Sequence, residues 1–519
     1  MLNTLDYTVL GIYVVALFLI AQLVSREKDQ HKKTGTDYFL AGKALPWWAV
    51  GASLIAANIS AEQIIGMSGS GYAIGLAIAS YEWMAALTLI IVGKFILPVF
   101  LARGINTMPE YLAQRFSPAV KNTMAVFWLG VYVFVNLTSI LWLGSLAIST
   151  VTGLGTVHGM LFLGTFALAY SLYGGLRAVA MTDIIQVVLL VGGGLMIAYV
   201  LLNELSGQQG VLAGFRELTA RAPEKFDMIL SPDNPHYISL PGLSVLLGGM
   251  WIMNLSYWGF NQYIVQRALG AKDLREAQKG IVFAAFLKVL MPIIVVLPGI
   301  AIYALNHDLA SPDQAYPTAL TLLPAGLKGL VFAALIAAIV SSLASMVNSI
   351  STIFILDIVP LFRRGEPAVH MVGWGRVVSC TAMLLALLVA KPLLGNFDQA
   401  FQYIQEFTGF FTPGICAIFL LGIFWQRTTS AGAFAAAILS GALSLLLKLA
   451  WPELPFIDRV GFVFVLCVVA AVLLSIMGAQ RSAQREPAVT SSQAVSFQTT
   501  TSYNVAAIAV IVVLSALYL

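Results

Sequence analysis

Long apolar runs alternate with short polar connections almost from one end of the chain to the other. A helix of about 20 apolar residues crosses a bilayer core of roughly 30 Å. The pattern therefore predicts an all-α integral membrane protein with about 14 transmembrane helices. They are expected at residues 7–24, 46–67, 73–101, 121–151, 157–173, 177–203, 240–264, 277–305, 327–358, 371–391, 397–425, 429–450, 458–477 and 502–519.

Basic residues collect in alternate loops, which predicts the orientation of the chain. The first loop carries Arg26, Lys28, Lys32, Lys33 and Lys43. Because loops rich in Lys and Arg stay in the cytoplasm, the N-terminus is expected outside, and 14 helices return the C-terminus to the outside as well. The first apolar run follows no basic segment and precedes no small-residue cleavage pattern, so it is interpreted as a retained helix.

Composition excludes several classes of protein. The 519 residues are 59% hydrophobic and 10% charged, with a mean hydropathy of +0.88, which leaves too little polar surface for a soluble domain. The net charge of +4 is dispersed among loops, so nucleic acid is not an expected partner. No nucleophile with an adjacent base and no set of metal ligands is recognisable, so an enzyme is not predicted.

Two of the predicted helices carry polar and glycine-rich centres, at 51–63 and 248–262. Unpaired backbone groups are costly in lipid, so such centres are typical of helices that break where they line a cavity. The two helices are five apart, as in an inverted repeat of five-helix units. The predicted organisation is therefore an extra N-terminal helix and loop at 1–45, repeats at 46–239 and 240–426, and three C-terminal helices at 427–519 with a flexible cytoplasmic linker at 478–501.

Five ionisable residues lie in or near predicted spans: Glu62, Glu82, Asp183, Lys288 and Glu406. A lone charge there costs roughly 2.5 kcal/mol or more, so these groups should pair or face a wet cavity. For Glu82 and Lys288 a substrate contact is favoured over a buried ion pair that only braces two helices. Glu62 and Glu406 lie near helix ends and are expected to be structural. Asp183 begins a helix and is either a cap or an ion ligand.

The remaining polar residues of these spans are mostly neutral. They are Asn58, Gln63, Asn136, Asn254, Asn261, Gln402 and Gln405, with Tyr81, Tyr257, Trp258 and Phe401 nearby. A pyranose suits such a lining, because its hydroxyls need several donors and acceptors while its C–H face packs on an aromatic ring. An amino acid would need a positive helix end or an arginine for its carboxylate.

Several motifs resemble the sodium:solute symporter family, and its sodium/glucose branch with the bacterial sodium/galactose symporters in particular. They are Asp37-Tyr-Phe-Leu-Ala-Gly-Lys43, Ala56-Ala-Asn-Ile-Ser-Ala-Glu-Gln63, Ser80-Tyr-Glu-Trp83, Tyr257-Trp-Gly-Phe-Asn-Gln-Tyr263, Ser341-Ser-Leu-Ala-Ser345 and Ala400-Phe-Gln-Tyr-Ile-Gln405. The resemblance covers nearly the whole chain. It implies a leucine-transporter-type core of ten helices, with one helix before it and three after. It also implies sodium-coupled symport of a hexose, galactose or glucose, by alternating access across a bacterial cytoplasmic membrane.

The resemblance also implies roles for individual residues. Sodium would be held by the carbonyls of Ala56, Ile59 and Ala338 and the hydroxyls of Ser341 and Ser342. The sugar would be held by Gln63, Glu82, Asn254, Tyr257, Lys288 and Gln405. Inner and outer gates would be formed by Tyr257 with Asn58, and by Met67, Tyr81 and Phe401. One departure concerns the hexose, because Ala85 stands where the galactose symporters have a serine that contacts the sugar.

The family pattern also bears on stoichiometry. Relatives that couple two sodium ions resemble one another in an aspartate, here Asp183, and in two hydroxyl residues at positions that are Ala344 and Ser345 here. A methyl group cannot ligate sodium, so one sodium per sugar is expected. Asp183 would then be either a waypoint for sodium leaving toward the cytoplasm or a helix cap. The alternative functions are symport of proline, sialic acid or myo-inositol, and a role as a nutrient sensor that does not transport. A single chain is sufficient for the transport mechanism.

Overall fold

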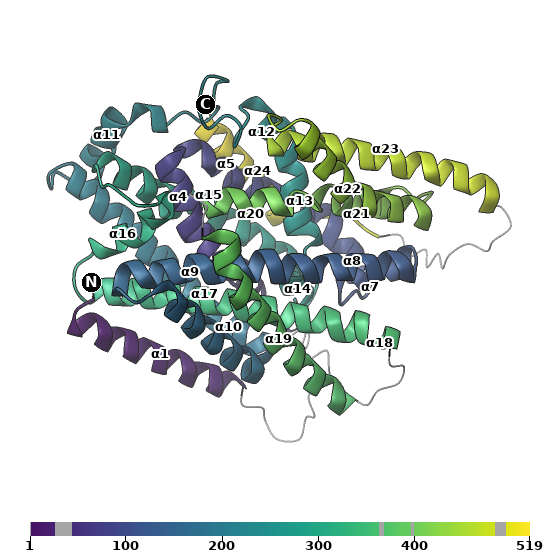
Figure 1. Ribbon diagram of the computed structural model, residues 1–519, viewed down its shortest axis with the longest axis horizontal. Coiled ribbons are helices and arrows are strands. Elements are labelled where there is room, and N and C mark those ends of the chain that lie inside the picture. The colour runs from purple at the N-terminus through teal and green to yellow at the C-terminus, as the bar shows by residue number, and fades with distance from the viewer. Residues whose placement is uncertain (1, 26–43, 363–367, 396–398, 483–494, 519) are drawn as a thin grey trace.

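The computed structural model describes residues 2–25, 44–362, 368–395, 399–482 and 495–518, and these form helices with short connections (Figure 1). In chain order the α-helices are α1 (Thr4–Ser25), α3 (Trp47–Asn58), α4 (Met67–Ala73), α5 (Ser80–Ile91), α6 (Leu97–Ala102), α7 (Met108–Arg115), α8 (Pro118–Val131), α9 (Thr138–Thr152), α10 (Thr156–Leu205), α11 (Val211–Arg221), α12 (Leu243–Leu247), α13 (Gly249–Phe260), α14 (Gln262–Leu269), α15 (Leu274–Ala304), α16 (Ala315–Thr321), α17 (Leu327–Ile353), α18 (Val359–Phe362), α19 (Ala368–Leu394), α20 (Ala400–Thr408), α21 (Thr412–Phe424), α22 (Ser430–Ala450), α23 (Phe456–Ser482) and α24 (Thr501–Tyr518). Four π-helical turns join neighbouring helices, at Glu62–Gly66, Val92–Ile96, Tyr132–Leu137 and Phe354–Ile358.

All fourteen predicted segments are helical over most of their length. Among the described residues, nine helices are long and apolar enough to cross a membrane, and two bent pairs of helices raise that number to 11. Shorter apolar helices include Thr4–Ala16 and Thr156–Ser171. The prediction of an all-helical membrane protein is therefore confirmed.

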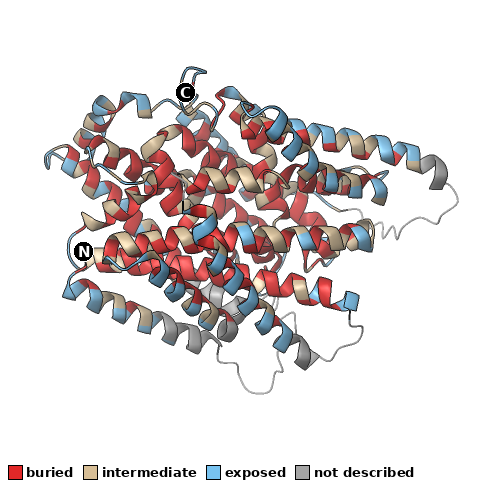
Figure 2. Cartoon of the chain, viewed as in Figure 1, coloured by how far each residue is buried: buried red, intermediate tan, exposed pale blue. Residues whose placement is uncertain are grey.

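The centre of the bundle is formed by α17, which packs against α10, α1 and α3, and by α15, which packs against α3, α4 and α5. Figure 2 shows buried residues concentrated in these central helices and exposed residues along α1 and α23. The exposed side chains on α23 are large and apolar, among them Phe462, Val465 and Val469. In water such a face would be unfavourable, so it is a lipid-facing surface.

Both predicted helix breaks are present. The first separates α3 from the helical segment Glu62–Ala73, which is bent from it by 62°; the backbone leaves the helical region at Ile59, with ψ 78°. The second separates α13 from α14 at Asn261, which is extended with φ −87° and ψ 123°. A third bend, of 46° between α20 and α21, was not predicted.

Two predicted connections differ from the structure. The two predicted spans 157–173 and 177–203 both lie in α10, of which the side chains at 172–183, including that of Asp183, lie outside the described residues. The helix predicted to end at 264 continues to Leu269 and buries Arg267, whose guanidinium donates to the Ser345 hydroxyl at 2.5 Å. The boundary predicted from hydropathy came too early, because a hydropathy scale treats every arginine as solvent-exposed, including one that is buried with a hydrogen-bond partner. The first basic cluster and residues 483–494 of the predicted linker lie outside the described residues.

Candidate functional site

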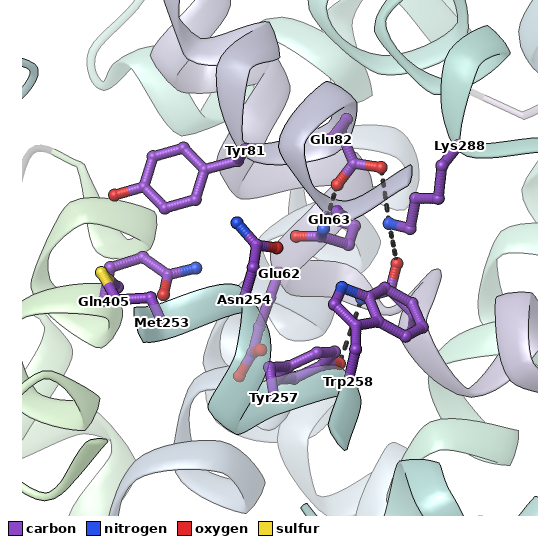
Figure 3. A pocket seen from close by; sticks show the side chains of 12 residues that line it. Glu62, Gln63, Tyr81, Glu82, Met253, Asn254, Tyr257, Trp258, Lys288 and Gln405 are labelled. Carbon is purple, nitrogen blue, oxygen red and sulfur yellow. Dashed lines mark hydrogen bonds and ion pairs between the residues drawn. The ribbon is translucent and has the colours of Figure 1, made fainter. Parts of the chain in front are cut away.

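A cavity of about 490 Å³ lies where the two broken helices approach α5, α15 and α20 (Figure 3). Its lining consists of Asn58, Glu62, Gln63, Tyr81, Glu82, Ala85, Met253, Asn254, Tyr257, Trp258, Lys288 and Gln405. These residues come from segments more than 300 positions apart in the chain. The cavity therefore exists only when the helices are packed together.

A buried ion pair crosses this cavity. Lys288 Nζ lies 2.5 Å from Glu82 Oε2, and both side chains are 1% exposed. The same ammonium donates to the Asn58 side-chain carbonyl, and the Gln63 amide donates to the other oxygen of Glu82. Four elements are thus joined by one charged network, as the dashed lines in Figure 3 show in part. Because each charge has its counter-charge, the cavity is polar without carrying a net charge from this pair.

Aromatic rings form another part of the lining, and Tyr257 is held on two sides. Its hydroxyl accepts from Asn58 Nδ2 at 3.0 Å and shares a hydrogen bond with the Tyr263 hydroxyl. Its ring meets that of Trp258 edge to face, with centroids 5.2 Å apart. The ammonium of Lys288 lies 5.1 Å from the Trp258 ring centroid. These contacts fix the orientation of an aromatic ring beside hydrogen-bonding groups.

The second break is held by a tyrosine from a neighbouring span. The Tyr132 hydroxyl donates to Asn261 Oδ1 at 2.5 Å and accepts from the Gln262 backbone N–H at 3.1 Å. The Gln262 side chain in turn accepts from the Met108 backbone N–H at 2.7 Å. The Gln262 N–H at the break therefore has a hydrogen-bond partner, as irregular backbone at membrane depth requires.

All six residues predicted to contact the sugar line the cavity: Gln63, Glu82, Asn254, Tyr257, Lys288 and Gln405. Of the predicted gate residues, Asn58, Tyr81 and Tyr257 line it as well. Met67 and Phe401 are buried outside the lining. Phe401 packs edge-on against Tyr81, with centroids 5.2 Å apart. The roles assigned to these residues stay predictions.

Three expectations about the lining of this cavity were wrong. Asn136, Asn261 and Gln402 do not line the cavity, because a polar residue in a span faces whichever neighbour its helix turns it toward. Glu62, expected to be structural, does line it and also accepts from the Ser139 hydroxyl. The sequence signal for Glu62 in the lining is that it directly precedes Gln63, a predicted sugar contact. Glu406 is structural as expected, since it pairs with Lys448 at 2.9 Å and Arg459 at 2.7 Å.

The residues predicted to hold sodium lie on two elements that pack together. Ala56 and Ile59 are at the end of α3, and Ala338, Ser341 and Ser342 are on α17, which contacts α3. All five are buried. The Ser342 hydroxyl is buried and has no hydrogen-bond partner among the described residues. A buried hydroxyl without a partner, on a helix that packs against α3, fits a cation that hard oxygen ligands would coordinate.

Comparison with known proteins identifies the family. The family model described as the sodium:solute symporter family matches residues 38–440. The chain belongs to this family. Over 537 aligned residues it is 50% identical to a sodium/glucose cotransporter of Vibrio parahaemolyticus, covering 100% of this chain and 98% of that protein. A pig sodium/myo-inositol cotransporter 2 is 33% identical, over 87% of this chain and 71% of that protein.

Solved structures of other transporters share the fold of this symporter. A sodium-coupled sialic acid symporter, in a substrate-bound outward-open state, superposes with a TM-score of 0.79 at 24% identity, covering 92% of this chain and 98% of that one. The nucleobase-cation symporter Mhp1 superposes with a TM-score of 0.56 at 14% identity, covering 88% and 98%. At these identities the likeness concerns the fold alone, which is of the leucine-transporter type.

Proposed function

We propose that this symporter carries a hexose, galactose or glucose, into the cell together with sodium by alternating access. The observation that carries the proposal is the cavity at the two helix breaks, lined by amides, a neutralised ion pair and aromatic rings. The relative that is 50% identical is named a sodium/glucose cotransporter, which supports the same substrate class. Sodium is a cosubstrate in this proposal and not a resident cofactor.

The lining suits a sugar because it offers donors and acceptors around one cavity. Gln63, Asn254 and Gln405 supply amides that both donate and accept, and Glu82 and Lys288 supply an acceptor and a donor of opposite charge. Tyr257 presents a ring on which the C–H face of a pyranose can stack. A free carboxylate on the substrate would disturb the balanced pair and would meet Glu62, so a neutral polyol is favoured over an acid.

Sodium is proposed to bind between the end of α3 and α17. Its ligands would be the carbonyls of Ala56, Ile59 and Ala338 and the hydroxyls of Ser341 and Ser342. Because the ion bridges a broken helix and a continuous one, it stabilises one relative position of the two and favours the outward-open state. The sugar then allows the outer side to close, and release inside requires sodium to leave and Tyr257 to move.

We further propose one sodium per sugar. Ala344 has no side-chain oxygen to offer at one of the two hydroxyl positions beyond Ser342. At the other, Ser345 already accepts from Arg267, and a guanidinium beside it opposes a second cation. A membrane potential supplies about 2.3 kcal/mol per charge per 100 mV. One sodium therefore supports roughly fifty-fold accumulation of sugar from each 100 mV.

The proposed orientation has both termini outside the bacterial cytoplasmic membrane. The N-terminal end of α1 and the helix α11, which lies in the long segment predicted outside, are at one end of the bundle, and α7 and α18 are at the other (Figure 1). This arrangement agrees with the sidedness expected from the basic loops. A single chain contains the complete cavity, so a monomer is sufficient.

The test is uptake into proteoliposomes containing the purified protein, with and without an inward sodium gradient. The substrates are galactose, glucose, fucose, myo-inositol, proline and sialic acid. We expect sodium-dependent accumulation of a hexose. Accumulation of proline or sialic acid without hexose uptake would refute the proposed substrate class. Sodium-dependent hexose binding without uptake would favour a sensor. Myo-inositol is the second candidate, because a relative with that name is 33% identical.

A further inference from the structure

Asp313 is a buried carboxylate that the proposed transport mechanism does not use. It lies in the turn Pro312–Gln314 between α15 and α16, and its side chain is 1% exposed. Its Oδ2 accepts a hydrogen bond at 3.0 Å from the backbone N–H of Ala400, the first residue of α20. The residue that precedes α20, Gln399, makes no capping hydrogen bond with its own side chain. The cap of α20 is therefore supplied from 87 positions away in the chain.

The outer half of the first broken helix is shaped to receive these groups. A Cβ on Gly69 would lie 2.5 Å from Asp313 Oδ1 and 2.8 Å from its Cα. A Cβ on Gly66 would lie 3.0 Å from Phe401 Cβ. The two glycines are three residues apart and so share one face of the helical segment Glu62–Ala73. Larger residues on that face would separate it from Asp313 and α20.

The helix that Asp313 caps carries two residues of the candidate site. Phe401 follows Ala400 directly and packs against Tyr81, which lines the cavity. Gln405 lies about one turn further along and lines the cavity itself. Because α20 is bent by 46° from α21, continuity with α21 does not by itself place its N-terminal end. Contacts at that end must do so.

We propose that Asp313 is a positioning residue. It holds the N-terminal end of α20 against the face of Glu62–Ala73 that carries Gly66 and Gly69, and thereby places Phe401 and Gln405 at the cavity. The carboxylate does this by accepting from Ala400 N–H, a donor that a helix cannot satisfy internally at its first turn. Contacts with α4 and with the turn before α16 then determine the position of α20. The proposal rests on the proposed alternating access, in which the outer side closes over the substrate.

The first experiment measures how often the N-terminal end of α20 moves away from the segment Glu62–Ala73. A cysteine is placed at Gln402, whose amide atoms are buried, in a protein carrying Cys380→Ser, since Cys380 is the exposed native thiol among the three. The rate of alkylation by a polar maleimide is measured in detergent with sodium and without sugar. We expect Asp313→Ala to raise that rate several-fold. Asp313→Asn keeps an oxygen acceptor and should stay near the parent rate, as should Asp308→Ala at an exposed position of the same connection.

The second experiment separates positioning from general damage. Asp313→Ala should raise the sugar concentration for half-maximal binding several-fold and leave that for sodium unchanged. Parent values for both alkylation and sugar binding would overturn the proposal, as would Asp313→Asn behaving like Asp313→Ala. If Asp313→Ala is not monodisperse, Gly69→Ala replaces it in the test, because its methyl group would displace the carboxylate and backbone of Asp313. A parent alkylation rate for Gly69→Ala would then refute the proposal. A parent protein that binds no sugar, with the alkylation difference intact, would refute the proposed function and leave the positioning role standing.

Discussion

Removal of one member of the Glu82–Lys288 pair tests whether the network binds sugar or only braces helices. Lys288→Met keeps the length of the side chain and deletes its charge. Glu82 would then be left as a carboxylate, 1% exposed, that still accepts a hydrogen bond from the Gln63 amide. An uncompensated charge of this kind costs about 3–5 kcal/mol. We therefore expect a clear fall in the midpoint of thermal unfolding in detergent, followed by tryptophan fluorescence.

The double variant Lys288→Met with Glu82→Gln separates the two roles. Replacing both members of a buried pair by neutral groups of similar volume is often nearly neutral for stability. The double variant should therefore unfold near the wild-type midpoint. If the pair contacts sugar, it should still fail to bind hexose in an assay with labelled substrate, while sodium affinity changes little.

The pair Lys448–Glu406 provides a matched control for the pair Lys288–Glu82. Lys448 also pairs with a glutamate, Glu406, but its side chain is 39% exposed and Glu406 keeps Arg459 as a second partner. Lys448→Met should therefore cost less than about 1 kcal/mol and leave sugar binding intact. Hexose binding at wild-type affinity by the double variant would refute the contact role. A double variant no more stable than Lys288→Met would refute the ion-pair reasoning.

Four further predictions follow from the same geometry. Tyr257→Ala should abolish concentrative uptake, because the ring supplies both stacking and the inner gate; wild-type uptake would contradict this. Ser342→Ala should weaken sodium activation of transport and leave hexose binding at saturating sodium unchanged, and an unchanged sodium dependence would exclude the hydroxyl as a ligand. Ala85→Ser adds a hydroxyl to the cavity, worth about 0.5–1.5 kcal/mol if it bonds the sugar, so galactose and glucose affinities should change relative to one another by about two- to tenfold. The membrane potential at which net sugar flux vanishes should fit one sodium per sugar, and a value fitting two would defeat the argument from Ala344.

The sequence predicted the spans and the two helix breaks because both depend on local composition. An apolar run of sufficient length has one stable state in lipid, and a cluster of polar and glycine residues within it has few alternatives to a break. The six sugar-contact candidates came from their polar or aromatic character within the spans and from motif resemblance, and all six line the cavity. The assignment of individual roles, and the division into repeats at 46–239 and 240–426, stay predictions.

Tertiary packing decided which polar residues share the cavity. Hydropathy indicates how deep a residue lies in the bilayer but not the direction its side chain faces, which depends on the rotation and crossing of each helix. Glu62 thus faces the cavity although it lies at a helix end, while Asn261 is turned to Tyr132 and Phe401 lies behind Tyr81. The bend between α20 and α21 and the capping of α20 by Asp313 have the same origin. They depend on contacts between segments distant in the chain, and the sequence alone carries no local signal for such contacts.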